Sequence, residues 1–238
     1  MASSNLNRLF IGSILVLVVL LFYINNFDLL FIFILLSFIS YDLFHIKVTS
    51  NYFLIFFFAS SILAMSLISF HLFENLFIFQ SIIVLCIFFL NKYKRELFIL
   101  SLYIFCIILF YIINIDRNLF YMLIFISFFN DTVAYIFGKY LKGPLILPKI
   151  SPKKTWSGTS ISFISTTLLL LFFDFDIFIS MLISSFLFIG DIFFSYIKRH
   201  LNIKDFSSLL GSHGGILDRL DSMFFVAIIF QIYLFYSV

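Results

Sequence analysis

Four aspartates are the residues of this 238-residue chain best suited to chemistry, because each stands in or beside a strongly apolar segment. Asp131 and Asp191 interrupt the runs SFFNDTVAYIFG and FLFIGDIFFSYI, and Asp218 and Asp221 are spaced i and i+3 just before another apolar run. A carboxylate at the centre of a membrane helix costs roughly 2.5–3.5 kcal/mol, so it is a candidate functional group. Oxygen ligands without His or Cys favour a hard ion such as Mg²⁺. The aspartates therefore predict a magnesium site, and four carboxylates leave room for a second cation such as K⁺.

Basic residues stand close to these aspartates in the sequence. They are Lys198, Arg199, Lys204 and Arg219, together with Lys149, Lys153 and Lys154 in the loop GPLILPKISPKKTWSG, whose prolines disfavour a helix. Arginine can bind a phosphate through two nitrogens, and lysine acts as a point charge. Two structural alternatives remain open: each aspartate could simply pair with a nearby Lys or Arg, and the basic loop could only orient the chain or contact anionic headgroups.

His213, Gly214 and Gly215 immediately precede the last apolar run. Glycines permit a tight turn, and the N–H groups at a helix start can bind a phosphate. With Asp218 and Asp221 directly after it, this segment predicts a metal-bridged phosphate site. His213 would act there as an acid or as a phosphate donor, although a lone His at a membrane interface is more often structural.

The composition excludes a soluble globular domain, since 63% of the residues are hydrophobic, 39 are Phe and only 11% are charged. A helix needs about 20 mostly apolar residues to cross a bilayer. We therefore expect an all-α polytopic membrane protein, in which 1–238 form a single integral membrane domain with N-terminal spans (1–118) and catalytic spans and loops (119–238). The nine expected transmembrane helices cover residues 9–24, 29–41, 52–70, 76–90, 97–113, 119–137, 158–173, 177–196 and 222–237. Residues 9–24 are expected to be an uncleaved span, and 29–41 is short for a full crossing.

Lysine and arginine are distributed very unevenly between the two sides of this nine-span arrangement. Of the 15 such residues, only Arg117 falls on the side that carries Asp28 and Glu74. The positive-inside rule then makes the N-terminus and the long basic loops cytoplasmic and the C-terminus outside. At about 1.5 Å per residue, Asp131 and Asp191 lie roughly 10 Å below the cytoplasmic boundary. The predicted site faces the cytoplasm from a cytoplasmic (inner) membrane.

The segment 195–221 resembles the signature of the phosphatidate cytidylyltransferase (CDP-diacylglycerol synthase) family, in which spacing and residue types are both fixed. The matching residues are Ser195, Lys198, Arg199, Lys204, Asp205, His213, Gly214, Gly215, Asp218, Arg219 and Asp221. Ser151 to Trp156 and Asn130-Asp131-Thr132 are also similar to family elements. Ser157 stands where the family commonly has Glu, and the resemblance covers about residues 127–222.

The resemblance implies a transfer of a cytidylyl group from CTP to phosphatidate, with Mg²⁺, in a membrane and with no nucleic acid; relatives suggest a homodimer. The implied catalytic residues are Asp191, Asp218, Asp221, Lys198, Arg199 and His213. Substrate-binding roles fall to Ser151, Lys153, Lys154, Lys204, Gly214, Gly215 and Arg219, and metal-binding roles to Asp131, Asp191, Asp218 and Asp221. Two alternatives remain: another CTP-dependent membrane lipid enzyme, of the CDP-archaeol synthase or prenol kinase type, or a cation-coupled transporter.

Overall fold

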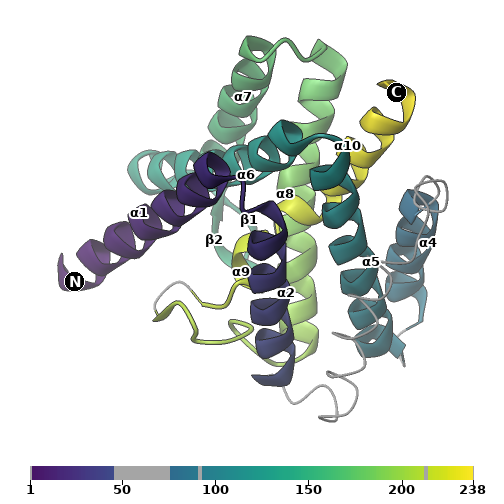
Figure 1. Ribbon diagram of the computed structural model, residues 1–238. Coiled ribbons are helices and arrows are strands. Elements are labelled where there is room, and N and C mark those ends of the chain that lie inside the picture. The colour runs from purple at the N-terminus through teal and green to yellow at the C-terminus, as the bar shows by residue number, and fades with distance from the viewer. Residues whose placement is uncertain (1, 46–75, 91–92, 212–213, 238) are drawn as a thin grey trace. The chain divides into compact units, whose positions relative to one another are not determined.

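The computed structural model describes residues 2–45, 76–90, 93–211 and 214–237, and most of them are helical (Figure 1). The helices are α1 (Ala2–Asn25), α2 (Asp28–His45), α4 (Leu76–Phe89), α5 (Lys94–Ile115), α6 (Arg117–Leu141), α7 (Trp156–Phe172), α8 (Ile177–His200), α9 (Leu217–Leu220) and α10 (Met223–Ser237). One small antiparallel sheet contains β1 (Leu145–Leu147) and β2 (Ser151–Thr155). The expected helical class is thus confirmed in its coarse form.

Within the described residues, three helices, α5, α6 and α8, are long and apolar enough to cross a bilayer. Shorter apolar helices lie within α1, α4, α7 and α10. Each of these seven helices closely overlaps an expected span. The expected span 29–41 lies inside α2, and the expected span 52–70 lies outside the described residues. The nine crossings and the sides of the two termini stay predictions.

The chain packs as two compact units, each assembled from segments that are distant in the sequence. The first unit contains Met1–Tyr121, Asp205–Asp218 and Phe230–Val238, and the second contains Met122–Lys204 and Arg219–Ile229. The expected single membrane domain stays a prediction.

In the first unit, α5 forms the core. Its Leu102, Phe105 and Ile108 side chains are fully buried, and α2 and α4 pack against this helix. At the start of α2, Asp28 forms an ion pair with Arg117, with 2.8 Å between the Asp28 Oδ2 and Arg117 Nε atoms. The unit is therefore held by apolar burial along α5 and by a charged pair at one end of α2.

The second unit contains the small sheet, which the sequence analysis did not predict. The strands run antiparallel, and Leu145 on β1 pairs with Thr155 on β2. Thr155 also caps α7, because its Oγ1 accepts a hydrogen bond from the Gly158 N–H at 3.3 Å. The sheet thus fixes the end of the basic loop and places Lys154 directly before α7.

Close packing and buried hydrogen bonds hold the helices of the second unit together. A Cβ atom on Gly158 of α7 would lie only 2.5 Å from the backbone oxygen of Ala134 on α6, so this crossing requires glycine. On the other side of α7, Thr167 donates a hydrogen bond to Ser184 of α8 at 3.0 Å. Small residues and hydroxyl groups commonly join helices in this way within membranes.

Candidate active site

Gly190 lets α8 approach the chain just ahead of α10. A Cβ atom at this position would lie 2.5 Å from the backbone oxygen of Asp221 and 3.1 Å from that of Ser222. The Phe193 and Phe224 rings stack nearby with 5.7 Å between their centroids. Because Asp191 directly follows Gly190, this contact brings two acidic segments of the second unit together.

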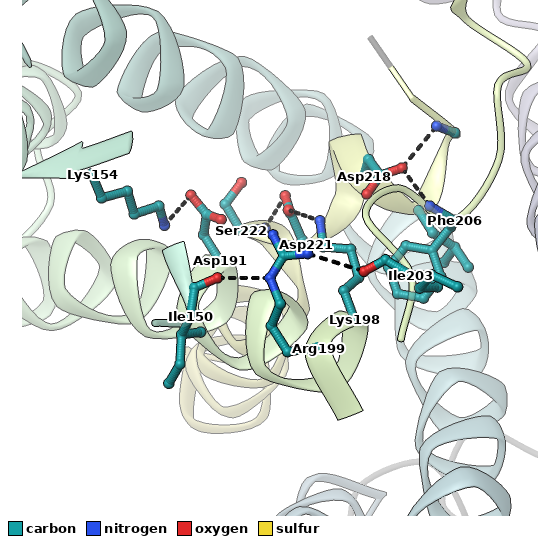
Figure 2. Close-up of polar contacts among 12 residues, drawn as sticks. Ile150, Lys154, Asp191, Lys198, Arg199, Ile203, Phe206, Asp218, Asp221 and Ser222 are labelled. Carbon is teal, nitrogen blue, oxygen red and sulfur yellow. Dashed lines mark hydrogen bonds and ion pairs between the residues drawn. The ribbon is translucent and has the colours of Figure 1, made fainter. Parts of the chain in front are cut away.

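Asp191 of α8 forms an ion pair with Lys154 at the end of β2 (Figure 2). The two side chains are 26% and 20% exposed, so both are half-buried. Lys154 also lies over the Phe188 ring, with its Nζ atom 5.5 Å from the centroid. The pair joins the basic loop to α8, with the Lys154 Nζ atom buried and the Asp191 side chain 26% exposed.

A second ion pair, between Lys198 of α8 and Asp221, is much more deeply buried. Lys198 is 8% exposed and Asp221 is 5% exposed, with 3.9 Å between the Lys198 Nζ and Asp221 Oδ2 atoms. Burial raises the pKa of Asp221 well above its ordinary value; Asp191 and Asp131 add to this rise, and Lys198 opposes it. The carboxylates of Asp131, Asp191 and Asp221 therefore lie close enough to repel one another.

Two buried serines fix the junction between α6 and α10. The hydroxyl oxygens of Ser127 and Ser222 are 2.5 Å apart, and both residues are almost fully buried. The Ser222 N–H donates to Asp221 Oδ1 at 2.9 Å. Ser127 stands four residues before Asp131, so both lie on one face of α6. The serine pair therefore helps to set where Asp131 stands in relation to Asp221.

Arg199 binds backbone oxygens rather than carboxylates. Its Nε atom donates to Ile150 O and its Nη1 atom donates to Ile203 O, both at 3.1 Å (Figure 2). These bonds tie the turn between β1 and β2 to the segment that follows α8. The catalytic role expected for Arg199 stays a prediction, since these contacts serve the fold.

In the first unit, Asp218 closes a turn of the segment 205–218. Its Oδ2 atom accepts hydrogen bonds from the Phe206 N–H at 2.9 Å and the Gly215 N–H at 2.8 Å (Figure 2). Gly214 has a φ of +82°, which favours glycine, and its N–H donates to Gly211 O at 3.3 Å. The glycine N–H groups expected to bind phosphate are thus used inside this turn.

The remaining predicted residues are placed as follows. Ser151 and Lys153 lie on β2, and Lys204 follows α8; both lysines are exposed. Arg219 lies on α9 and is near enough to Asp221 to lower its pKa. His213 lies outside the described residues. The roles assigned to these residues stay predictions.

In the described part of the chain, no three His, Cys, Asp or Glu side chains are grouped so as to hold a metal ion. The donors of the second unit still fit a hard cation chemically. Asp131, Asp191 and Asp221 offer only oxygen atoms, and burial together with mutual repulsion disfavours the charge on Asp221. Lysines balance two of these carboxylates, as the structural alternative in the sequence analysis allowed.

Asp42 is the acidic residue that the sequence analysis missed. It lies in the last turn of α2, is fully buried and binds Ser207 and Leu217 of the segment 205–218. A signal was present, because Asp42 directly follows the expected span 29–41 on the side assigned to the cytoplasm. The prediction rested instead on the four aspartates that lie within or directly before apolar runs and family-like motifs.

The chain resembles one protein family and several named proteins. The model of the cytidylyltransferase family matches residues 7–237. A phosphatidate cytidylyltransferase of Rickettsia typhi is 40% identical over 116 residues, which are 42% of this chain and 51% of that protein. One of Aquifex aeolicus is 37% identical over 151 residues, which are 60% of this chain and 58% of that protein. The chain spans about half the length of the curated relatives it matches. Because the family match extends over nearly all of it, the chain belongs to the cytidylyltransferase family.

Proposed function

We propose that the chain transfers a cytidylyl group from CTP to phosphatidate, forming CDP-diacylglycerol and pyrophosphate. The observation that carries this proposal is the pairing of Lys154 with Asp191 and of Lys198 with Asp221 in one unit of an apolar helical chain. Every reactant and product carries phosphate groups, which lysines bind and which carboxylates bind through a metal ion. The relatives named as phosphatidate cytidylyltransferases supply the substrate class.

In the proposed reaction a phosphate oxygen of phosphatidate attacks the α-phosphorus of CTP. The bond between the α-phosphorus and the oxygen that bridges to the β-phosphate breaks, and its electron pair leaves with pyrophosphate. The protein forms no covalent bond, so its work is to position the reactants and to neutralise charge. The Lys154 Nζ atom and the Lys198 side chain are both buried, so each would hold positive charge for a phosphate where little water competes.

The proposed site also includes Mg²⁺, with Asp131, Asp191 and Asp221 as the residues that would hold it. When bound, the ion supplies positive charge for the negative charge that develops on the transferring phosphates. The raised pKa of Asp221 supports this assignment, since Lys198 alone does not offset its burial and its acidic neighbours. Asp218 stays a further predicted ligand, and K⁺ a second predicted cation.

We further propose that the chain crosses a cytoplasmic (inner) membrane nine times, with the N-terminus and the site facing the cytoplasm and the C-terminus outside. The distribution of Lys and Arg supports this arrangement. A cytoplasmic site would meet CTP directly and phosphatidate from the inner leaflet. The homodimer implied by the family resemblance is part of the same proposal.

The full chain, purified in detergent, should convert radiolabelled CTP and phosphatidate into lipid-soluble CDP-diacylglycerol only when Mg²⁺ is present. Excess GTP or dATP should compete poorly, and Asp218→Asn should remove the activity while expression is retained. Asp28→Asn is the matched control, because Asp28 pairs with Arg117 outside the proposed site. Transfer of the CTP γ-phosphate to a prenol, or use of an ether-linked archaeal acceptor alone, would favour the alternative lipid enzymes. No product with any acceptor would overturn the proposal.

A further inference from the structure

Asp42 is a buried acid whose partners are far away in the sequence. Its side chain is 0% exposed; its Oδ1 atom accepts a hydrogen bond from Ser207 Oγ at 2.6 Å, and its Oδ2 atom accepts one from the Leu217 N–H at 2.8 Å. These partners are 165 and 175 residues further along the chain. Burial raises the pKa of Asp42, and the bonds from Ser207 and Leu217 oppose that rise. A carboxylate this deeply buried normally serves its hydrogen-bond partners.

The described residues of the segment 205–218, which are 205–211 and 214–218, include several that lie directly against the Asp42 carboxylate. A Cβ atom on Gly215 would lie 2.7 Å from Asp42 Cγ, so only glycine permits this approach. Asp42 and Asp218 both bind one residue near the start of the segment and one near its end. For Asp218 these are Phe206 and Gly215. The two carboxylates therefore hold the same stretch of backbone together.

A separate apolar contact also anchors the segment to the first unit. Phe206 stacks on Phe98 of α5, with 5.9 Å between the ring centroids and 13° between the planes. Both rings are almost fully buried. This contact does not involve Asp42, so a variant of Asp42 should loosen the segment without detaching it from α5.

We propose that Asp42 is a positioning residue that fixes the segment 205–218, and through it Asp218, for cytidylyl transfer. Asp42 itself touches no reacting atom in this proposal; it acts through Ser207 and Leu217. The inference rests on the proposed function, because Asp218 is a predicted catalytic and metal-binding residue of that reaction. The order of the segment, however, can be measured whether or not the chain has this activity.

Asp42→Asn is the sharpest variant, because it keeps the shape of the side chain while replacing one acceptor oxygen with an NH₂ donor. The Ser207 hydroxyl and the backbone N–H groups of Leu217 and Ile216 donate to Asp42, and the NH₂ group in Asp42→Asn can accept none of these bonds. One hydrogen bond is therefore lost or badly distorted. Ser207→Ala removes the same hydrogen bond by deleting its donor, and the double variant completes a double-mutant cycle. Asp28→Asn changes another acid of α2 and serves as the control.

We expect Asp42→Asn to lower kcat/KM for CTP about tenfold or more, with KM for phosphatidate within twofold of the parent value. Hydrogen exchange should accelerate in peptides from 205–218 and not in peptides from α8. The double variant should be little worse than Asp42→Asn, because both changes break one interaction. Asp28→Asn should leave kcat/KM for CTP and the exchange in 205–218 as in the parent.

The inference fails if the folded Asp42→Asn protein shows the parent's hydrogen-exchange rates in 205–218. It fails too if the free-energy costs in kcat/KM of Asp42→Asn and Ser207→Ala simply add in the double variant. It also fails if the apparent kcat falls only in proportion to the fraction of unfolded protein while both KM values stay parental, which is the pattern of a merely structural acid. If Asp42→Asn does not fold, Ser207→Ala decides by the same exchange and kinetic measurements. If the variants differ from the parent in hydrogen exchange as predicted but the parent makes no CDP-diacylglycerol, the proposed function is refuted. The link between Asp42 and the segment 205–218 then still stands.

Discussion

The close approach at Gly190 yields a sharp prediction, because one added methyl group should separate the acidic segments of the second unit. In Gly190→Ala, the new Cβ would lie 2.5 Å from the Asp221 backbone oxygen, whereas ordinary contact begins at 3.4 Å. Backbone cannot rotate away as a side chain can. Either α8 or the chain ahead of α10 must therefore shift by about 0.9 Å, the difference between these distances.

Such a shift has two separable costs. Overpacking a tight contact costs roughly 1–3 kcal/mol of stability. A misplacement of about 1 Å among reacting groups can cost roughly 100-fold in rate. Because Asp191 follows Gly190 directly, we expect Gly190→Ala to lower kcat for CDP-diacylglycerol formation about 100-fold with only a modest fall in the midpoint of thermal unfolding.

Gly158→Ala is the matched control for this prediction. Its Cβ would also lie 2.5 Å from a backbone oxygen, that of Ala134, but at the crossing of α7 and α6. The loss of stability should be similar and the loss of kcat smaller. The rate of CDP-diacylglycerol formation and thermal unfolding are measured on both variants in one detergent. Equal losses of kcat in the two variants, or parental activity in Gly190→Ala, would refute the reasoning about spacing.

Three further predictions concern the charges and the hydroxyl pair. The pKa of Asp221 is raised above 3.8, so the folded chain binds this proton more tightly than the unfolded chain does. With a chelator present, the free energy of unfolding should therefore fall as pH rises through the raised pKa. Thermal unfolding of Asp221→Asn should lack this dependence on pH. Lys198→Met should cost roughly 3–5 kcal/mol, because the Asp221 side chain that loses its lysine is only 7% exposed. Lys154→Met should cost less, because the Asp191 side chain that loses its partner is 26% exposed. Denaturant titration compares the two variants, and equal costs would contradict this view. Ser222→Ala should cost about 1–3 kcal/mol in the same titration, since its buried serine partner on α6 loses a hydrogen bond.

Hydropathy was sufficient to place the long helices, because a run of apolar residues leaves few other structures open to the chain. It could not place their ends. The helix α8 continues past the expected span 177–196 to His200, and its last turn carries Lys198 and Arg199. Basic residues in this position interact favourably with the negative end of the helix dipole, which lets the helix run beyond the apolar segment.

The short sheet could not be predicted because β1 has only three residues, Leu145–Leu147, between prolines. Alternation of apolar and polar residues needs a longer run to be recognised. The tie between Asp42 and Ser207 was also beyond sequence reasoning, since it joins residues 165 positions apart. Local spacing could mark Asp191 and Asp221 as unusual, but their lysine partners became evident only from the fold.

Asp191, Asp218 and Asp221, together with Asp42, fall into two kinds: acids that form an ion pair with a lysine, and acids that hold the segment 205–218 through hydrogen bonds. The two kinds should therefore differ in their roles. Asp191 and Asp221 face lysines, so replacing them changes the charge available to a bound phosphate or cation. Asp42 and Asp218 accept backbone N–H groups, so replacing either one releases a turn. Variants of the first kind should lose turnover while hydrogen exchange in the segment 205–218 stays as in the parent. Variants of Asp42 or Asp218 should lose turnover in proportion to the increase in hydrogen exchange of the segment 205–218. A variant of Asp221 that loosened the segment, or one of Asp218 that left it ordered, would show that this division by partner is wrong.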